Sequence, residues 1–198
     1  MLEQIDRSLF LFINSHNSIF WDRIMYAVSG KAIWIPLYIA IITLIIIKYR
    51  RRAYILVPLI IVTVIITDQL SVHAFKEVFM RLRPCREPTL EGMVHLVNGK
   101  CPGKWGFVSS HAANSFGVAI ISLLLLRRRW FTISMVAWAS LIGYSRVYLG
   151  VHYPGDVICG SLLGIVVAYL VYGIYKEFDK RFAIKKSANS KETINASD

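Results

Sequence analysis

Five apolar segments constrain the fold of this chain more than any other feature. They cover residues 24–47, 53–75, 112–126, 130–144 and 157–175, and Gly30 and Lys31 interrupt the first of them. A helix needs about 20 mostly apolar residues to cross a bilayer, and several of these runs are shorter, so polar residues at their ends must complete the helices. We therefore predict an all-α, polytopic membrane helix bundle with about five transmembrane helices and a functional site at one membrane face.

Composition favours a membrane protein over a nucleic-acid-binding one. The 198 residues are 56% hydrophobic and carry a formal net charge of +11, and in a soluble protein such a charge would suggest nucleic acid. Here the basic residues fall between apolar runs, where membrane topology and anionic lipid explain them better. We expect the lipid bilayer as a partner and no nucleic acid, and the sequence leaves the oligomeric state open.

The N-terminal residues 2–14 have apolar side chains on one side of a helical pattern and charged side chains elsewhere. The segment is too short to cross a bilayer, so we predict an amphipathic helix that lies in the membrane interface. Glu3 and Asp6 precede any long apolar run, which argues against a cleaved signal peptide.

Three basic groups follow the first, third and fifth apolar segments, at residues 48–52, 127–129 and 176–186. If five spans alternate, these groups share one side, which the positive-inside bias assigns to the cytoplasm. The loops 76–107 and 146–155 then share the external face, the periplasmic side if this is a bacterial inner membrane. We predict one membrane-embedded domain over residues 1–184 and a disordered cytoplasmic tail over residues 185–198.

The loop before the fifth segment combines Arg146, His152 and Asp156, with a proline between the last two. Pro154 suits the first turn of a helix, where its missing N–H costs nothing, so Asp156 would lie in that turn near His152. A carboxylate there holds an imidazole in one tautomer, as at other activated nucleophiles. We interpret His152 as a candidate nucleophile and Arg146 as a phosphate ligand. The alternative is a membrane-edge loop that faces lipid headgroups.

Lys76, Arg83 and Pro84 form a second group. If one helix ran through both cations, they would lie on one face about 10 Å apart, and Pro84 would end or kink that helix. Two converging cations suit a phosphoryl group, whose charge is spread over several oxygens. The alternative is a pair of ordinary basic residues at the membrane edge.

Residues 106–111 form a third group, directly before the third apolar segment. Ser109 or Ser110 is a natural N-cap, and the free amides of the first turn would make an anion site. His111 could protonate a leaving oxygen there. The alternative is a plain cap beside a histidine that faces headgroups.

All three groups lie at the predicted external face and together supply three cations, a helix N-terminus and two histidines. The acidic residues nearby are too few for a two-metal centre, so we expect no metal and no other cofactor. The combined pattern predicts metal-independent phosphoryl transfer through histidine.

The three groups resemble the motifs of the type 2 phosphatidic acid phosphatase superfamily, which are Lys-x6-Arg-Pro, Pro-Ser-Gly-His and Ser-Arg-x5-His-x3-Asp. The corresponding residues here are Lys76 to Arg83-Pro84, then Val108-Ser109-Ser110-His111, then Ser145-Arg146 to His152 and Asp156. The first and third motifs match in full. In the second, Val108 and Ser110 replace proline and glycine. The resemblance extends over about residues 68–164.

This resemblance implies a catalytic role for His152, which would attack phosphorus and form a phosphohistidine, with Asp156 as its partner and His111 as the proton donor to the leaving group. The groups implied to stabilise the transition state are Lys76, Arg83, Arg146 and the amides of Ser109 and Ser110. The implied substrate is a membrane lipid: undecaprenyl diphosphate, a lipid A phosphate, phosphatidic acid or phosphatidylglycerophosphate.

Two other classes of function remain open from the sequence. One is a phosphotransferase that passes the phosphoryl group to an acceptor other than water. The other is a non-catalytic protein that binds or transports lipid headgroups. Because binding would need only the cations, the presence of His111, His152 and Asp156 argues against this class.

Three features outside the motifs also carry expectations. Asp68, within the second apolar segment, indicates a functional or helix-pairing group, because carboxylates inside a membrane are costly. Cys85 and Cys101 both fall in the external loop, where an oxidising environment would allow a disulfide. Gly160 and Gly164 form a small-xxx-small pair, which predicts tight helix packing.

Overall fold

The computed structural model describes the backbone of residues 1–195 and the side chains of residues 1–180. Within that range all regular elements are helices, and one isolated bridge joins Leu82 to Trp105. The all-α class is therefore confirmed. The main helices are α1 (Leu2–Ser15), α2 (Ile19–Ser29), α3 (Ile35–Tyr49), α4 (Ala53–Gln69), α5 (Glu77–Phe79), α6 (Ser110–Leu126), α7 (Arg129–Tyr148) and α8 (Pro154–Asn195).

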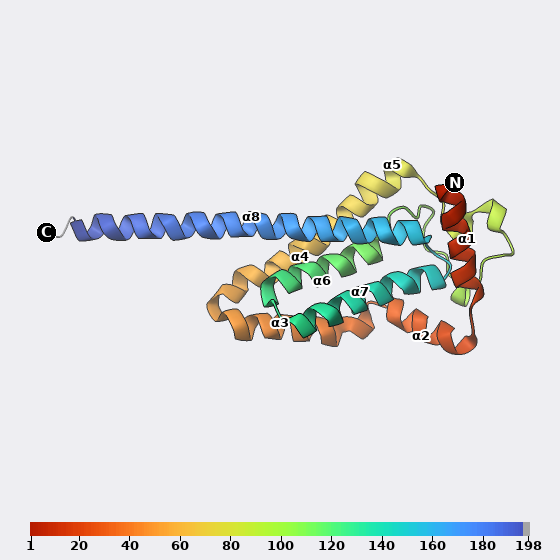
Figure 1. The fold of residues 1–198 in the computed structure, drawn as a ribbon, viewed down its shortest axis with the longest axis horizontal. Helices are drawn as coiled ribbons and strands as arrows, with labels where there is room; N and C mark the ends of the chain where they lie inside the picture. Colours follow the sequence, from red (N-terminus) through yellow and green to blue (C-terminus); the bar gives the residue numbers. More distant parts are fainter. Residues whose placement is uncertain (196–198) are drawn as a thin grey trace.

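Helix α6 lies at the centre of a bundle and contacts α3, α4, α7 and α8. These helices run roughly along the long axis of the molecule, whereas α1 crosses one end of it (Figure 1). The core around α6 is apolar and includes the buried Ile121, Leu125 and Met135. The bundle therefore places the start of α6, the end of α7 and the start of α8 at the end that α1 covers.

The glycine pair of α8 lets this helix approach α6 closely, as the sequence predicts. A Cβ on Gly160 would lie 2.5 Å from the Ser109 carbonyl oxygen, and one on Gly164 would overlap the carbonyl oxygen of Ala113. Real Cβ atoms do not come so close to backbone atoms. The two glycines therefore hold the start of α8 against the start of α6.

We expect Gly164→Ala to destabilise the protein by about 1–3 kcal/mol, because the added methyl group must push two packed helices apart. The measurement is the midpoint of thermal unfolding in detergent. Gly173→Ala on the same helix is the matched control, because a Cβ there has no neighbour within 4 Å and alanine favours helix. Equal midpoints for the two variants would contradict the packing role of Gly164.

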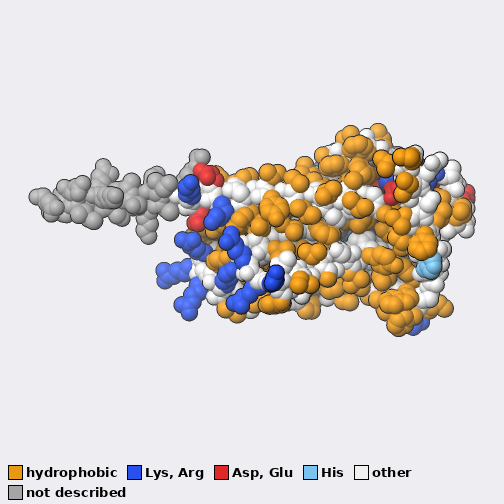
Figure 2. Space-filling view, viewed as in Figure 1, with side chains coloured by type: hydrophobic (Ala, Val, Ile, Leu, Met, Phe, Trp, Pro, Cys, Tyr) orange, Lys and Arg blue, Asp and Glu red, His pale blue; other side chains and the backbone are white. Residues whose placement is uncertain are grey.

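Two helical stretches in the described residues are long and apolar enough to cross a membrane, Ala32–Phe79 with 48 residues and Pro154–Lys180 with 27. The first folds back on itself through α3 and α4, and Ser110–Leu126 is a shorter apolar helix. Large hydrophobic side chains remain exposed along the bundle, including Ile39, Ile61 and Leu170, and they cover most of the face in Figure 2. An outer surface of this kind suits contact with lipid.

The predicted first span over residues 24–47 is wrong as a single helix. Helix α2 ends at Ser29, because Gly30 adopts an extended conformation with ψ of 140°. A short 3-10 turn, Ala32–Trp34, follows before α3 begins with Pro36 in its first turn. The break falls at Gly30 and Lys31, the two residues that interrupt this apolar segment in the sequence.

The three basic groups gather at one end of the bundle. Lys48 and Arg52 from the α3–α4 turn, Arg127 after α6 and Lys176 on α8 line one cavity there, and Figure 2 shows the cluster of basic side chains. This agrees with the predicted sorting of charge. The predicted disordered tail covers residues 185–198. The side chains of these residues and the backbone of residues 196–198 lie outside the described part of the chain, so the disorder stays a prediction.

A disulfide joins Cys85 to Cys101, with Cα atoms 6.0 Å apart, in agreement with the sequence hypothesis. It closes part of the long connection between α5 and α6 at the opposite end from the basic groups. Within this connection, its first residues also pair with its last ones. Gly106 N–H donates to the Arg81 carbonyl oxygen at 2.8 Å, and Arg83 N–H donates to the Lys104 carbonyl oxygen at 3.4 Å. These contacts give a stable shape to a segment that is mostly non-helical.

Candidate active site

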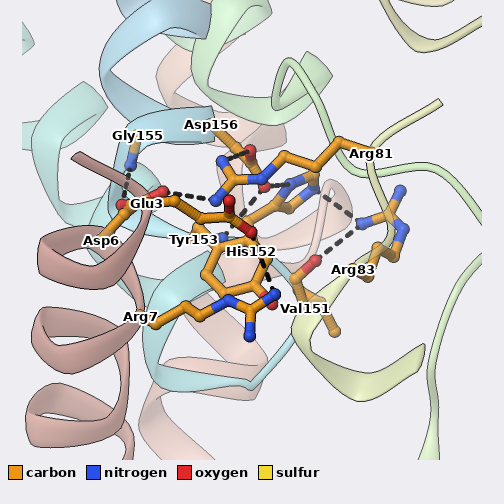
Figure 3. A network of polar contacts seen from close by, with 10 residues as sticks. All are labelled: Glu3, Asp6, Arg7, Arg81, Arg83, Val151, His152, Tyr153, Gly155 and Asp156. Atoms are coloured by element: carbon orange, nitrogen blue, oxygen red, sulfur yellow. Dashed lines mark hydrogen bonds and ion pairs between the residues drawn. The ribbon is translucent and has the colours of Figure 1, made fainter. Parts of the chain in front are cut away.

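His152 and Asp156 lie where the chain enters α8, under helix α1. Pro154 opens α8 and Asp156 lies in its first turn, as predicted. His152 is 1% exposed and Asp156 is fully buried. The histidine Nδ1 lies 3.3 Å from Asp156 Oδ2, so the predicted pair is brought together (Figure 3).

The partners of His152 define its tautomer. Arg83 Nη1–H points at His152 Nε2 across 2.8 Å, and a guanidinium can only donate. Nε2 must therefore accept, which leaves the ring proton on Nδ1 beside the Asp156 carboxylate. This arrangement leaves Nε2 with a lone pair, which a nucleophilic atom needs.

Burial lowers the pKa of His152 well below its ordinary value, and the nearby Arg83, Arg146 and Lys76 lower it further. A depressed pKa means that the ring stays neutral as the pH falls through 6.5. The neutral form of His152, with its lone pair on Nε2, therefore persists in mildly acidic solution.

We expect no loss of kcat/KM that is attributable to His152 between pH 8 and about pH 6, because the ordinary histidine pKa is about 6.5 and this one lies below it. The measurement is the pH profile of kcat/KM. The ionisation of the substrate phosphate is measured by phosphorus NMR in the same micelles, and the profile is corrected for it. A remaining acid limb centred at pH 6.5 or above would contradict the expectation.

Arg83 and Arg146 are buried cations, 7% and 8% exposed. Arg83 also donates to the Val151 carbonyl oxygen at 3.0 Å, and Arg146 donates to the Ser29 hydroxyl. Burial lowers the pKa of Arg83 to about 10, so the side chain remains charged at neutral pH. The Nε atoms of both arginines are buried and have no hydrogen-bond partner among residues 1–180.

Lys76 and Arg83 both reach the site, but not from one helix as the sequence predicted. The helical path ends at Phe79, because Met80 takes a left-handed conformation with φ of 46°. The chain then turns back, and Pro84 opens a separate 3-10 turn. The two cations converge because tertiary pairing returns the chain to the site, not because of helical spacing.

The sequence predicts that the backbone amides of Ser109 and Ser110 act alike, as two donors to a phosphate, but they differ in their hydrogen bonds. Ser109 is the N-cap of α6, one of the two positions predicted for the cap. Its N–H donates to the Asp156 carbonyl oxygen at 3.0 Å, so this amide already has a partner within the protein. The Ser110 amide is one of the N–H groups that a helix start leaves open. The Ser110 hydroxyl accepts from Lys76 Nζ and lies 2.6 Å from the Ser71 hydroxyl.

Arg81 and Asp6 complete the surroundings of Asp156, and sequence reasoning missed both. Arg81 Nη1 donates to Asp156 Oδ1 at 2.8 Å and its Nη2 to Asp6 Oδ2 at 2.7 Å. The other Asp6 oxygen accepts from the Gly155 N–H at 2.7 Å. Helix α1 is thereby tied to the first turn of α8 (Figure 3). Nothing in the sequence signalled these contacts except the position of Arg81 inside the first motif.

Two cavities meet at the site. The first, of about 440 Å³, is a mainly apolar groove between α3, α4 and α6. The second, of about 700 Å³, lies toward the connection between α5 and α6 and includes Arg146. His111, Ser29 and Gly30 line both. His111 therefore lies at the junction between the mainly apolar groove and the cavity that includes Arg146. Among the described side chains, no group of three His, Cys, Asp or Glu residues could hold a metal ion.

Comparison with known families gives one match. A sequence model described as the PAP2 superfamily matches residues 57–180. That range includes all eight predicted site residues, from Lys76 to Asp156.

Two curated relatives are similar over most of their length. One, a lipid A 4'-phosphatase of Bacteroides thetaiotaomicron, is 40% identical over 91% of this chain and 81% of the relative. The other, a lipid A 4'-phosphatase of Porphyromonas gingivalis, is 33% identical over 87% and 73%.

Two crystal structures share the fold. Aquifex aeolicus LpxE has a TM-score of 0.61 and 25% identity, over 84% of this chain and 93% of that one. A transmembrane PAP2-type phosphatidylglycerolphosphate phosphatase from Bacillus subtilis has a TM-score of 0.65 at 22% identity, over 89% and 87%. The fold is thus that of transmembrane phosphatases.

Proposed function

Because this chain belongs to the PAP2 superfamily, and is therefore a membrane phosphatase, we propose that it hydrolyses a phosphate group of lipid A or of a chemically related envelope lipid. The reaction proceeds through a phosphohistidine on His152. It takes place at the external face of the membrane, the periplasmic side in a bacterium with two membranes.

The observation that carries this proposal is a group of buried cations for which the described side chains supply no matching anion. Arg83 and Arg146 are buried, each with an unpartnered Nε, and Lys76 approaches the same site through Ser110. The nearest buried carboxylate, Asp156, already accepts from Arg81. Buried cations are costly unless paired, so these side chains suit an anion with several oxygens, such as phosphate.

The geometry supports a two-step reaction. His152 Nε2 attacks phosphorus, the bond from phosphorus to the leaving oxygen breaks, and His111 gives that oxygen a proton. Asp156 stabilises the positive charge that the ring acquires. Water, which loses a proton to His111, then attacks phosphorus and breaks the bond to Nε2. Before the first step Arg83 must shift its donor from Nε2 to a phosphate oxygen, which binding of the phosphate favours.

The paired cavities support an amphiphilic substrate. The apolar groove can take acyl chains while the phosphate lies among the cations, and His111 stands between the two. The relatives named lipid A 4'-phosphatase favour lipid A among the candidates. The disulfide supports an external site, because disulfides persist in oxidising compartments.

The test is phosphate release by purified protein in detergent, with EDTA, from lipid A, undecaprenyl diphosphate, phosphatidic acid and phosphatidylglycerophosphate. We expect release that survives EDTA, fastest with lipid A. Acceptor lipids are added in a parallel series, so that a phosphotransferase would show a phosphorylated acceptor instead of free phosphate. Binding of these lipids without release or transfer by folded protein would contradict an enzyme of either kind.

A further inference from the structure

A polar pair, Asp68 and Asn114, lies in the mainly apolar groove. Asn114 Nδ2 donates to Asp68 Oδ1 at 3.1 Å, and the Thr67 hydroxyl donates to Asn114 Oδ1 at 2.6 Å. Asp68 and Asn114 both line the 440 Å³ groove, together with Ser110 and His111 of the site. The pair therefore faces the space that the proposed function assigns to the lipid part of the substrate.

Helix pairing explains only half of this arrangement. The Asp68–Asn114 bond joins α4 to α6, but a neutral amide at residue 68 could accept the same bond without the cost of a carboxylate in a membrane. Asp68 Oδ2 has no hydrogen-bond or ion-pair partner within residues 1–180. One oxygen holds the helices together, and the other is open to a ligand.

The position of the pair limits what this ligand group can be. Asn114 lies four residues after Ser110 on α6, which is about 6 Å along the axis, so the pair lies one helical turn deeper than the phosphate site. The groove wall around it is apolar and includes Val64, Ile65 and Val118. A lipid with its phosphate among the cations would place here the atoms that join its headgroup to its acyl chains.

Asp68 can only accept a hydrogen bond when it is ionised, so it selects a donor. We propose that Asp68, held by Asn114, accepts from an amide N–H or a hydroxyl of the substrate, and so favours phosphorylated N-acyl amino-sugar lipids over lipid phosphates without a nearby donor. Polyprenyl diphosphates and phosphatidic acid lack such a donor beside the phosphate. The inference rests on the proposed phosphatase function and defines its substrate class.

The test compares two proteins on two lipids. The lipids are a phosphorylated N-acyl glucosamine lipid and an analogue whose amide is replaced by an ester and whose hydroxyls are methylated. For the parent protein we expect kcat/KM to favour the donor-bearing lipid about 10- to 100-fold. In Asp68→Asn this ratio falls close to one. An unchanged ratio, or an equal loss on both lipids, would overturn the proposal.

Thr63→Val is the matched control. Thr63 is buried on the same helix, and its hydroxyl donates to the Leu59 carbonyl oxygen, so the variant removes a polar group of α4 without touching the groove. We expect the substrate ratio of the parent protein. A ratio as low as that of Asp68→Asn would assign the effect to helix packing and overturn the proposal.

Dissociation constants of the same two lipids, measured in a His152→Ala background with and without Asp68→Asn, do not require turnover. They separate two kinds of failure. Absence of hydrolysis with an Asp68-dependent preference in binding would contradict the phosphatase function alone. Hydrolysis of both lipids without that preference would contradict the role of Asp68 alone.

Discussion

We expect His152→Gln to abolish phosphate release. The expected fall in kcat is about 10⁶-fold, which is typical when an enzyme loses its catalytic nucleophile. The physical reason lies in the two ring nitrogens. Nδ1 faces Asp156 and Nε2 holds the lone pair that would attack phosphorus. Glutamine keeps a polar group in the pocket but has no nitrogen lone pair to form the intermediate.

The measurement is release of labelled phosphate together with trapping of the phosphoenzyme in alkali, where phosphohistidine survives. His73→Gln is the control, because His73 is 63% exposed and pairs with Glu77 on the outside of the helix. We expect full activity and normal trapping for that variant. Label that remained on the His152→Gln protein would contradict the assignment of the nucleophile.

Asp156→Asn is expected to lower kcat by about 10³- to 10⁴-fold, the size of effect found when the carboxylate that orients a catalytic histidine becomes an amide. The amide can turn its NH₂ toward Nδ1, which favours the tautomer with the proton on Nε2 and removes the nucleophilic lone pair. Asp156 also accepts from Arg81 and from the Tyr153 N–H at 3.0 Å, so the variant weakens the support around it as well.

Asp6→Asn distinguishes two effects of Asp156→Asn: weaker hydrogen bonds around Asp156, and a changed tautomer of His152. Asp6 accepts from Arg81 and Gly155 but does not contact His152, so its amide variant leaves the bond between Arg81 and Asp156 in place. We expect a loss of about 10-fold or less in kcat, consistent with one weakened hydrogen bond. Equal losses for the Asp6 and Asp156 variants in steady-state kinetics would contradict a special role for the histidine–carboxylate pair.

Much of the site could be predicted from local patterns. Pro154 at the start of α8, Ser109 as the cap of α6 and the pairing of His152 with Asp156 all depend on residues a few positions apart. Backbone geometry over one or two turns is set by the residues themselves, through the fixed φ of proline and the short side chain of serine. The glycine pair of α8 also follows from residue size alone.

Long-range partners could not be predicted in this way. The convergence of Lys76 and Arg83 depends on the turn at Met80 and on pairing with residues 104–106. Asp6 is 150 residues from Asp156, and only the fold brings Arg81 between them. By contrast, the break at Gly30 coincides with the Gly30–Lys31 interruption that is visible in the first apolar segment.

By itself, the sequence determined an all-helical membrane protein and which side chains its site can use, because helical hydropathy and motif spacing are local properties. The tertiary structure alone decided which polar groups remain free. Burial forces backbone amides and charged side chains to find partners, and those partners come from distant segments: Ser109 gives its amide to Asp156, and Asp156 takes Arg81. Arg83 and Arg146 keep open Nε donors, which the proposed function assigns to a phosphate, because no described segment supplies a partner to these atoms.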